Sequence, residues 1–335
     1  MVLRAIPPTT LARLATLGSL IALGLSLAAA DPARGGEIGH FTAPLADIRD
    51  YAMPAKPGFY FKEYDYYYHT NTFKDRHGDK VSNIDLPRGG RVHVDADVDI
   101  FVLAPTFMWV SKWEILGAHY GAYIIPTFGN SSVDASLTTI RDFGVHSDES
   151  SFGVGDMYVE PIWLGWTLKN WDFAVGYGFY APIGQYNSGD TDNVGLGFWT
   201  NQFQGSVAWY PNENRGTALV AAVTYEINSK IEGQHLTPGQ RLNVNLGADQ
   251  MLPLGQSGFL LDVGVGLYGQ WQITDDTGSD AVDPNVHDQV YGVGPQLGLT
   301  YLPWNAAATA KWQHEFEAEN RFEGENFTMN FAVGF

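Results

Sequence analysis

The stretch RVHVDADVDIFV, residues 91–102, alternates between apolar and polar side chains almost without interruption. Its apolar positions are Val92, Val94, Ala96, Val98, Ile100 and Val102, and its polar positions are His93, Asp95, Asp97 and Asp99. A period of two predicts a β-strand, because successive side chains of a strand leave opposite faces. One face of this strand therefore meets water and the other an apolar environment. Whether that environment is a protein core or a lipid bilayer depends on the rest of the chain.

The composition favours a β-protein outside the cytoplasm. The 335-residue chain has 38 glycines, 14% aromatic residues and only 17% charged residues, whereas charged residues make up about a quarter of an average soluble domain. Cysteine is absent, which excludes a disulfide framework and thiolate metal sites.

Residues 1–30 have the features of a bacterial secretory signal peptide. Arg4 and Arg13 give a positively charged start, residues 14–27 are apolar, and the alanines at 28–30 form a small-residue cleavage site. Cleavage would remove both arginines and lower the formal net charge of −18 by two units, to −20. This acidic balance argues against nucleic acid as a partner, because phosphate binding needs lysine and arginine. After residue 30, no apolar run reaches the ~18 residues of a membrane-spanning helix.

From residue 57 onward, the chain divides into twelve segments with the length and alternation of membrane-barrel strands. These segments are 57–71, 91–107, 112–126, 153–167, 170–182, 197–210, 216–228, 239–252, 258–273, 288–302, 306–317 and 325–335. The connections are alternately long and short, with long ones at 72–90, 127–152, 183–196, 229–238, 274–287 and 318–324 and short ones at 108–111, 168–169, 211–215, 253–257 and 303–305. An up-and-down bacterial barrel sorts its loops in this way, whereas a Greek-key β-sandwich has no reason to do so. We therefore predict an all-β fold, a transmembrane up-and-down antiparallel barrel of about 12 strands over residues 57–335.

In such a barrel, the apolar face of residues 91–102 meets lipid and the polar face meets the lumen. A one-residue shift of register would exchange the two faces and place carboxylates in hydrocarbon, at about 1–2 kcal/mol each. The predicted permeant-contacting residues of the lumen are His93, Asp95, Asp97, Asp99, Asp156, Glu160, Glu226 and Arg241. Two interpretations of this acidic set stay open, namely a ladder that attracts cations and an internal salt-bridge network that only fills the barrel. Twelve strands lie between the roughly eight of a filled barrel and the sixteen or more of an open channel.

The C-terminal segment FTMNFAVGF, residues 327–335, alternates and ends on an aromatic residue. We interpret Phe331, Val333 and Phe335 as the signal by which the barrel-assembly machinery recognises an outer-membrane protein. Tryptophan and tyrosine residues near the predicted strand ends suit the aromatic girdles of a membrane barrel.

Residues 31–56 precede the first predicted strand and are too long for a simple leader. They lie either in the periplasm or inside the barrel as a plug, and the sequence leaves both possibilities open.

No catalytic, cofactor or metal site is predicted. Carboxylates at alternate positions of one strand form a single row, whereas a glycosidase needs two groups on opposite sides of a bond. No serine, histidine and acid combination resembles a barrel lipase. The acidic loops 188–193 and 274–285 lack the fixed glycine and distal glutamate of an EF-hand, and solvation or cation-bridged contact with lipopolysaccharide is the simpler interpretation of them.

Three segments resemble the phenol-degradation meta-pathway family of outer-membrane proteins. They are KPGFYFKEYDYYYHTNTFKDRHGD (56–79), GVGDMYVEPIWLGW (153–166) and GYGFYAPIGQY (176–186), and the resemblance runs from about residue 40 to Phe335. It implies a transporter-like barrel in the outer membrane of a Gram-negative bacterium that imports aromatic or hydrophobic compounds, with no catalytic residue.

The sequence thus predicts an outer-membrane channel for the passive uptake of small molecules, in contact with outer-membrane lipid and lipopolysaccharide. A structural or adhesive barrel with a blocked lumen is the first alternative, and a barrel hydrolase is the second.

Overall fold

The computed structural model describes residues 39–335, apart from 87–89, 140–143, 189–192 and 282. The predicted signal peptide and residues 31–38 lie outside the described residues. Almost all of the described chain is β-structure, with two short 3₁₀-helices, η2 (Ile48–Tyr51) and η3 (Leu302–Trp304). Among the described residues, no helix combines the length and apolar character needed to span a membrane.

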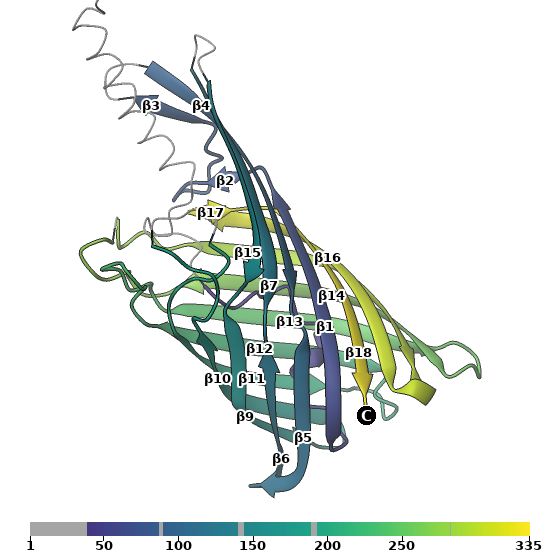
Figure 1. Cartoon of the computed structure of the whole chain (residues 1–335). Coiled ribbons are helices and arrows are strands. Elements are labelled where there is room, and N and C mark those ends of the chain that lie inside the picture. Colours follow the sequence, from purple (N-terminus) through teal and green to yellow (C-terminus); the bar gives the residue numbers. More distant parts are fainter. Residues whose placement is uncertain (1–38, 87–89, 140–143, 189–192, 282) are drawn as a thin grey trace, which may run out of the picture.

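The strands form one antiparallel sheet that closes on itself as a twelve-pass barrel, because β1 pairs with β18 (Figure 1). Nine passes are single strands: β1 (Gly58–Thr70), β10 (Trp171–Ala181), β11 (Thr200–Trp209), β12 (Thr217–Asn228), β13 (Arg241–Pro253), β14 (Phe259–Gln272), β15 (Gln289–Tyr301), β16 (Ala306–Glu319) and β18 (Glu325–Gly334). Three passes are pairs of consecutive strands: β4 (Gly90–Leu103) with β5 (Thr106–Ile115), β6 (Ala118–Ile125) with β7 (Phe128–Thr139), and β8 (Gly144–Val154) with β9 (Met157–Thr167). The short strands β2 (Phe73–Lys74) and β17 (Arg321–Phe322) pair with each other, and β3 (Asn83–Leu86) pairs with β4. The predicted fold class is therefore confirmed.

The three divided passes bend next to proline or glycine. Pro105 separates β4 from β5, Pro126 separates β6 from β7, and Gly155 separates β8 from β9. Proline donates no ladder hydrogen bond, so it suits a break between two strand halves. Beyond the bends, β4 continues past the end of β1, with β3 on one side and the hairpin β7–β8 on the other (Figure 1).

Two predicted boundaries are wrong. The turn predicted at 108–111 lies inside β5, and the chain instead reverses at Leu116–Gly117, where both residues have positive φ (53° and 76°). Most of the loop predicted at 127–152 forms the hairpin β7–β8. Its sequence is rich in serine, threonine and aspartate, so a search for apolar alternation does not detect it.

The wall of the barrel has its large apolar side chains outside and its polar ones inside. On β12, Leu219 and Val223 are 42% and 44% exposed, whereas Thr224 and Glu226 are buried. Aliphatic and aromatic side chains of the other wall strands are exposed in the same way. This inverted distribution is that of a barrel surrounded by lipid.

Strand β4, which contains residues 91–102, is turned the other way. Val98 is buried and Asp97 is exposed, so His93, Asp97 and Asp99 lie on the outer face and not in the lumen. The side chain of Asp95 lies outside the part of the chain for which the structure describes side chains. The prediction failed because β1 ends at Thr70, opposite Val98. Residues 90–97 therefore lie beyond the end of β1, and the outward Asp99 is paired with His69 one residue before that end, where its carboxylate is bonded by Tyr67 and His69.

Residues 39–53 lie in the lumen, and we name this segment the plug; Ala55 and Lys56, which follow it, are exposed. Gly39 approaches the side chain of Arg241, the first residue of β13, at the end of the barrel that carries the long loops. Ten residues later, Arg49 bonds to the carbonyl groups of Arg215 and Gly216, in a short turn at the opposite end. The plug therefore runs along the axis of the barrel before it enters β1.

Candidate functional site

The upper part of the plug, at the end of the barrel that carries the long loops, is held through its main chain and through one histidine. Glu226 Oε1 on β12 accepts hydrogen bonds from the backbone N–H groups of His40 (3.2 Å) and Phe41 (3.0 Å). The His40 ring lies 3.0 Å from Asp156 Oδ2 and 2.8 Å from Thr200 Oγ1, and its side chain is only 4% exposed. A carboxylate that accepts two main-chain N–H groups fixes the backbone, so Glu226 anchors the start of the plug.

Side chains of three wall strands bind the carbonyl groups in the middle of the plug. Gln270 Nε2 donates to Phe41 O (3.0 Å), Asn245 Nδ2 donates to Ala43 O (2.8 Å), and Lys311 Nζ donates to Ala46 O (2.5 Å). These contacts satisfy main-chain groups that would otherwise be buried without partners.

The lower part of the plug, at the end of the barrel that carries the short turns, is held by ion pairs. Lys62 of β1 contacts Asp47 and Asp50 at 2.6 Å each, and Arg49 contacts Asp249 of β13 at 2.7 Å. Ile48 packs on an apolar cluster of four residues, Ala208, Tyr210, Ala218 and Val220. The plug is thus bound to opposite sides of the barrel, and it occupies the axis along which a permeant would move.

A cavity of about 150 Å³ remains between the plug and the wall formed by β1, β4–β6 and β9–β12. Aromatic and other apolar side chains make up much of its surface. They include Tyr64, Tyr66, Met108, Ile125, Tyr123, Tyr158, Trp163 and Tyr180. Its polar surface includes the amides of Gln202 and Gln204 on β11. We name this space the tyrosine cavity.

A buried carboxylate behind this surface organises its polar groups. Glu160 on β9 is fully buried and accepts hydrogen bonds from the hydroxyls of Tyr123 (2.8 Å) and Tyr158 and from Gln204 Nε2 (2.5 Å). The neighbouring strand β10 leaves room for it, because a Cβ at Gly176 would lie 1.9 Å from Glu160 Oε1. The absence of a side chain at Gly176 therefore lets the Glu160 side chain lie flat on the wall.

The four remaining lumen predictions are buried inside the barrel, but the lining of the tyrosine cavity includes none of them. Asp156 bonds to the plug and to the backbone N–H groups of Gly184 (3.0 Å) and Leu196 (2.7 Å) in the following loop. Arg241 forms a two-pronged ion pair with Asp288 (2.7 and 2.5 Å). These contacts hold the chain itself, and contact with a permeant stays a prediction for Asp156, Glu160, Glu226 and Arg241.

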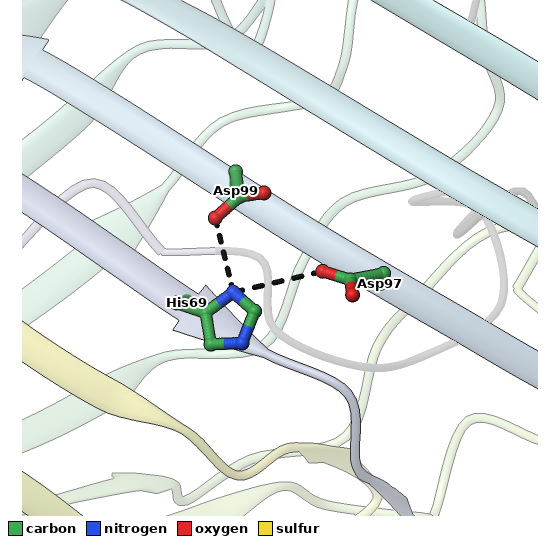
Figure 2. Close-up of side chains that lie close together, drawn as sticks. All are labelled: His69, Asp97 and Asp99. Carbon is green, nitrogen blue, oxygen red and sulfur yellow. Dashed lines mark hydrogen bonds and ion pairs between the residues drawn. The ribbon is translucent and has the colours of Figure 1, made fainter.

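A second group of polar side chains lies on the outer face of the barrel, where β1 meets β4 (Figure 2). His69 Nδ1 lies 3.0 Å from Asp99 Oδ1 and 3.6 Å from Asp97 Oδ1, and one donor atom from each residue lies within 4.8 Å of the others. One imidazole and two carboxylates are a donor set that suits a divalent cation. The sequence gives no signal for this group, because His69 lies on another strand, about 30 residues from Asp97 and Asp99, and no motif connects the three residues.

A closed sheet with an apolar outer surface and a polar lumen defines this chain as an outer-membrane type of β-barrel. The family model described as "Putative MetA-pathway of phenol degradation" matches residues 70–331. The match covers well over half of the chain, and the chain therefore belongs to this family, as its sequence segments predicted.

A solved structure agrees with the fold. An outer-membrane channel from Pseudomonas putida F1 superimposes with a TM-score of 0.60 at 15% sequence identity, over 87% of this chain and 100% of that chain. The β domain of a Bordetella autotransporter gives a TM-score of 0.46 at 12% identity, over 84% of this chain and 100% of that chain. No curated protein sequence matches the chain.

Proposed function

We propose that the protein is a passive channel of the bacterial outer membrane that takes up small aromatic or hydrophobic molecules. The observation that carries this proposal is the tyrosine cavity beside the plug. A cavity of about 150 Å³ accommodates a molecule of the size of benzene, and its aromatic lining suits an apolar guest. The proposal includes no catalytic role and no cofactor.

The orientation follows from the loops. Bacterial barrels carry short turns on the periplasmic side and long loops outside, so the plug would start near the cell surface and end at the periplasm. Residues 1–30 would direct export, and Phe331, Val333 and Phe335 would be read by the barrel-assembly machinery. Outer-membrane lipid and lipopolysaccharide would surround the wall.

Uptake requires the plug to move, because its contacts span the lumen from wall to wall. Its main-chain groups and charges are bonded to polar wall residues, and water can replace such bonds one at a time. The same contacts favour the second candidate function, a structural or adhesive barrel whose lumen stays blocked.

A disulfide lock separates the two candidates. The chain has no cysteine, and a Cβ built on Gly247 would lie 3.2 Å from Ile48 Cβ, close to the ~3.8 Å between the Cβ atoms of a disulfide. The double variant Ile48→Cys/Gly247→Cys should therefore tie the plug to β13 when it is oxidised.

Transport is measured in vesicles whose outer leaflet is lipopolysaccharide, with radiolabelled toluene as the permeant. We expect the reduced double variant to accelerate uptake over empty vesicles and oxidation to remove most of that acceleration. The single variant Ile48→Cys is the control and should not respond to oxidant. If the wild-type protein gives no acceleration at all, the blocked barrel is the better function. If the oxidised lock transports as fast as the reduced form, the plug is not the gate.

A further inference from the structure

His40 connects the start of the plug to the wall through both nitrogens of its ring. Nε2 lies 3.0 Å from Asp156 Oδ2, and Nδ1 lies 2.8 Å from Thr200 Oγ1. The ring stacks on Tyr180 with 4.6 Å between the ring centroids and meets the edge of Phe198 at 4.7 Å. The side chains of His40 and Asp156 are each 4% exposed, so water has little access to them. The protons of the ring therefore have to match the protein groups around it.

The direction of the hydrogen bond between His40 and Thr200 follows from the neighbours of Thr200. The carbonyl oxygen of Gly239 can only accept, and it lies 2.8 Å from Asn228 Nδ2. The Asn228 amide therefore turns its oxygen towards Thr200 and accepts the single hydroxyl proton of Thr200 at 2.7 Å. Thr200 has only lone pairs left for His40, so Nδ1 of the ring has to carry a proton.

The other ring nitrogen also carries a proton. Asp156 accepts hydrogen bonds from the backbone N–H of Gly184 at Oδ1 (3.0 Å) and from that of Leu196 at Oδ2 (2.7 Å). Two main-chain donors favour the ionised form of a carboxylate, and an ionised carboxylate can only accept a hydrogen bond from Nε2. Because both nitrogens donate, the His40 ring is an imidazolium that faces the Asp156 carboxylate.

The other charged groups around His40 are compatible with a positive ring. Glu226 of β12 accepts the backbone N–H of His40 at 3.2 Å. Arg241 of β13 lies beside the preceding residue of the plug, but Asp288 already binds its guanidinium in a two-pronged ion pair (2.7 and 2.5 Å). The ring from β10 and the hydroxyl from β11 are uncharged. The imidazolium therefore lies between the carboxylates of Asp156 and Glu226, and the nearby guanidinium is neutralised by its own partner.

We propose that His40, Asp156 and Thr200 form a proton-dependent latch, and that loss of one proton from His40 releases the upper part of the plug. A neutral imidazole has a single donor, so it satisfies either Asp156 or Thr200 but not both. The closed plug therefore holds one proton that the released plug gives up above neutral pH, and a rise in pH favours release. This inference rests on the proposed function, in which the plug is the gate, and it adds the signal that opens the gate.

The first test measures the protons of the ring by NMR on the full barrel in detergent micelles, with ¹⁵N in the imidazole rings. The chain has nine histidines, and the signals of His40 are those that disappear in His40→Gln. We expect both ring nitrogens of His40 to carry protons at about pH 7.5, where an exposed histidine is mostly neutral. A ring with one proton in the wild-type protein at this pH would overturn the inference.

The variant Thr200→Val keeps the size of the side chain and removes the acceptor of Nδ1. His40 should then keep only the proton that Nε2 donates to Asp156. Thr106→Val is the matched control, because Thr106 on β5 is also buried but donates its hydroxyl proton to the carbonyl group of Ala104 (3.2 Å), and this variant should leave both protons on the ring. Two protons on the ring in Thr200→Val would overturn the role of Thr200.

The second test measures release of the plug by hydrogen exchange at pH 7 and pH 8, with each rate divided by that of the unfolded peptide at the same pH. The backbone N–H groups of His40 and Phe41 report release, because both are bonded to Glu226. A difference of one proton raises the released fraction about tenfold for each pH unit, so the protection of residues 40–41 should fall about tenfold. In His40→Gln the protection should not change with pH.

Two results would overturn the latch. The first is equal protection of residues 40–41 at both pH values in the wild-type protein, which decides the matter even if no variant folds. The second is a fall of the same size in His40→Gln, which keeps the bond of Lys311 to the carbonyl group of Ala46 and would assign the pH dependence to a group other than His40.

Neither measurement needs transport, so the two proposals fail separately. A plug that is released by a rise in pH, in a barrel that does not accelerate the uptake of toluene, would remove the channel and keep the latch. Uptake through a barrel whose plug does not respond to pH would keep the channel and remove the latch.

Discussion

Replacement of Arg49 by methionine should release the lower half of the plug. Arg49 makes four hydrogen bonds in the structure, two to the Asp249 carboxylate (2.8 and 2.7 Å) and one each to the carbonyl groups of Arg215 (3.0 Å) and Gly216 (2.8 Å). The Asp249 side chain is fully buried, so the substitution leaves its charge without this partner.

The magnitude follows from the burial of the pair. Removing one partner of a buried ion pair costs about 3–5 kcal/mol, and the 22% exposure of the Arg49 side chain puts this pair at the lower limit. About 3 kcal/mol corresponds to roughly a hundredfold increase in the population of the released plug, since 1.4 kcal/mol is a factor of ten.

The assay is hydrogen exchange with mass spectrometry on the folded barrel in detergent micelles. Peptides that cover residues 43–52 should exchange about a hundredfold faster in Arg49→Met, whereas peptides from β14 should not change. The double variant Arg49→Met/Asp249→Leu removes the buried charge as well and should recover much of the protection. Unchanged exchange of residues 43–52 in the single variant would refute the reasoning, because it would show that the ion pair does not hold the plug.

Two further predictions concern the stability of the barrel, and both are measured by urea unfolding in lipid vesicles. Gly176→Ala should lower the free energy of unfolding by about 1–3 kcal/mol, because the new Cβ collides with Glu160 Oε1 at 1.9 Å; Gly205→Ala has no atom within 4 Å and should be close to neutral. Asp288→Asn should cost a constant amount from pH 8 to pH 5, and an equal cost at pH 3 would contradict this account. Burial alone would raise the pKa of Asp288, but the guanidinium of Arg241, with a second arginine nearby, holds that pKa below its ordinary value. The ionised form therefore stabilises the folded state above about pH 4, and that contribution is lost only as the pH falls further.

The sequence was sufficient to predict the barrel, its number of passes and the family, because lipid imposes one simple rule on every wall strand. A strand inside the bilayer has to present apolar side chains on alternate positions, and the chain repeats this pattern from β9 onward. The rule no longer applies where a strand leaves the bilayer. For this reason the same alternation predicts the wrong face for Asp97, and a search for apolar alternation does not detect the polar hairpin β7–β8.

The candidate site is harder to predict from the sequence than the fold. Alternation shows which face of the sheet a side chain lies on, but it does not show which other side chains it contacts. Tyr64, Tyr66 and Tyr68 lie at alternate positions of β1 and all face the lumen, and that spacing was the available signal. Tyrosine is equally common in the outer girdles of barrels. The spacing alone therefore does not distinguish tyrosines that face the lumen from tyrosines that face lipid. The plug contacts have no local signature at all, since their partners are separated by up to 283 residues.

The hydrogen-bond partners of the buried ionisable side chains indicate which part of the lumen selects the permeant. Asp156 and Glu226 bind the plug, Arg241 binds Asp288, and Glu160 binds hydroxyl and amide groups. A charged group that is already satisfied within the protein has little to offer a passing ion, because attracting the ion would mean giving up short, buried bonds. The tyrosine cavity is lined largely by aromatic and other apolar side chains, with the amides of Gln202 and Gln204 among its polar groups. Selection among permeants should therefore depend on contacts with the aromatic rings, and substitution of the buried carboxylates should change the closure of the barrel more than the choice of molecule that crosses it.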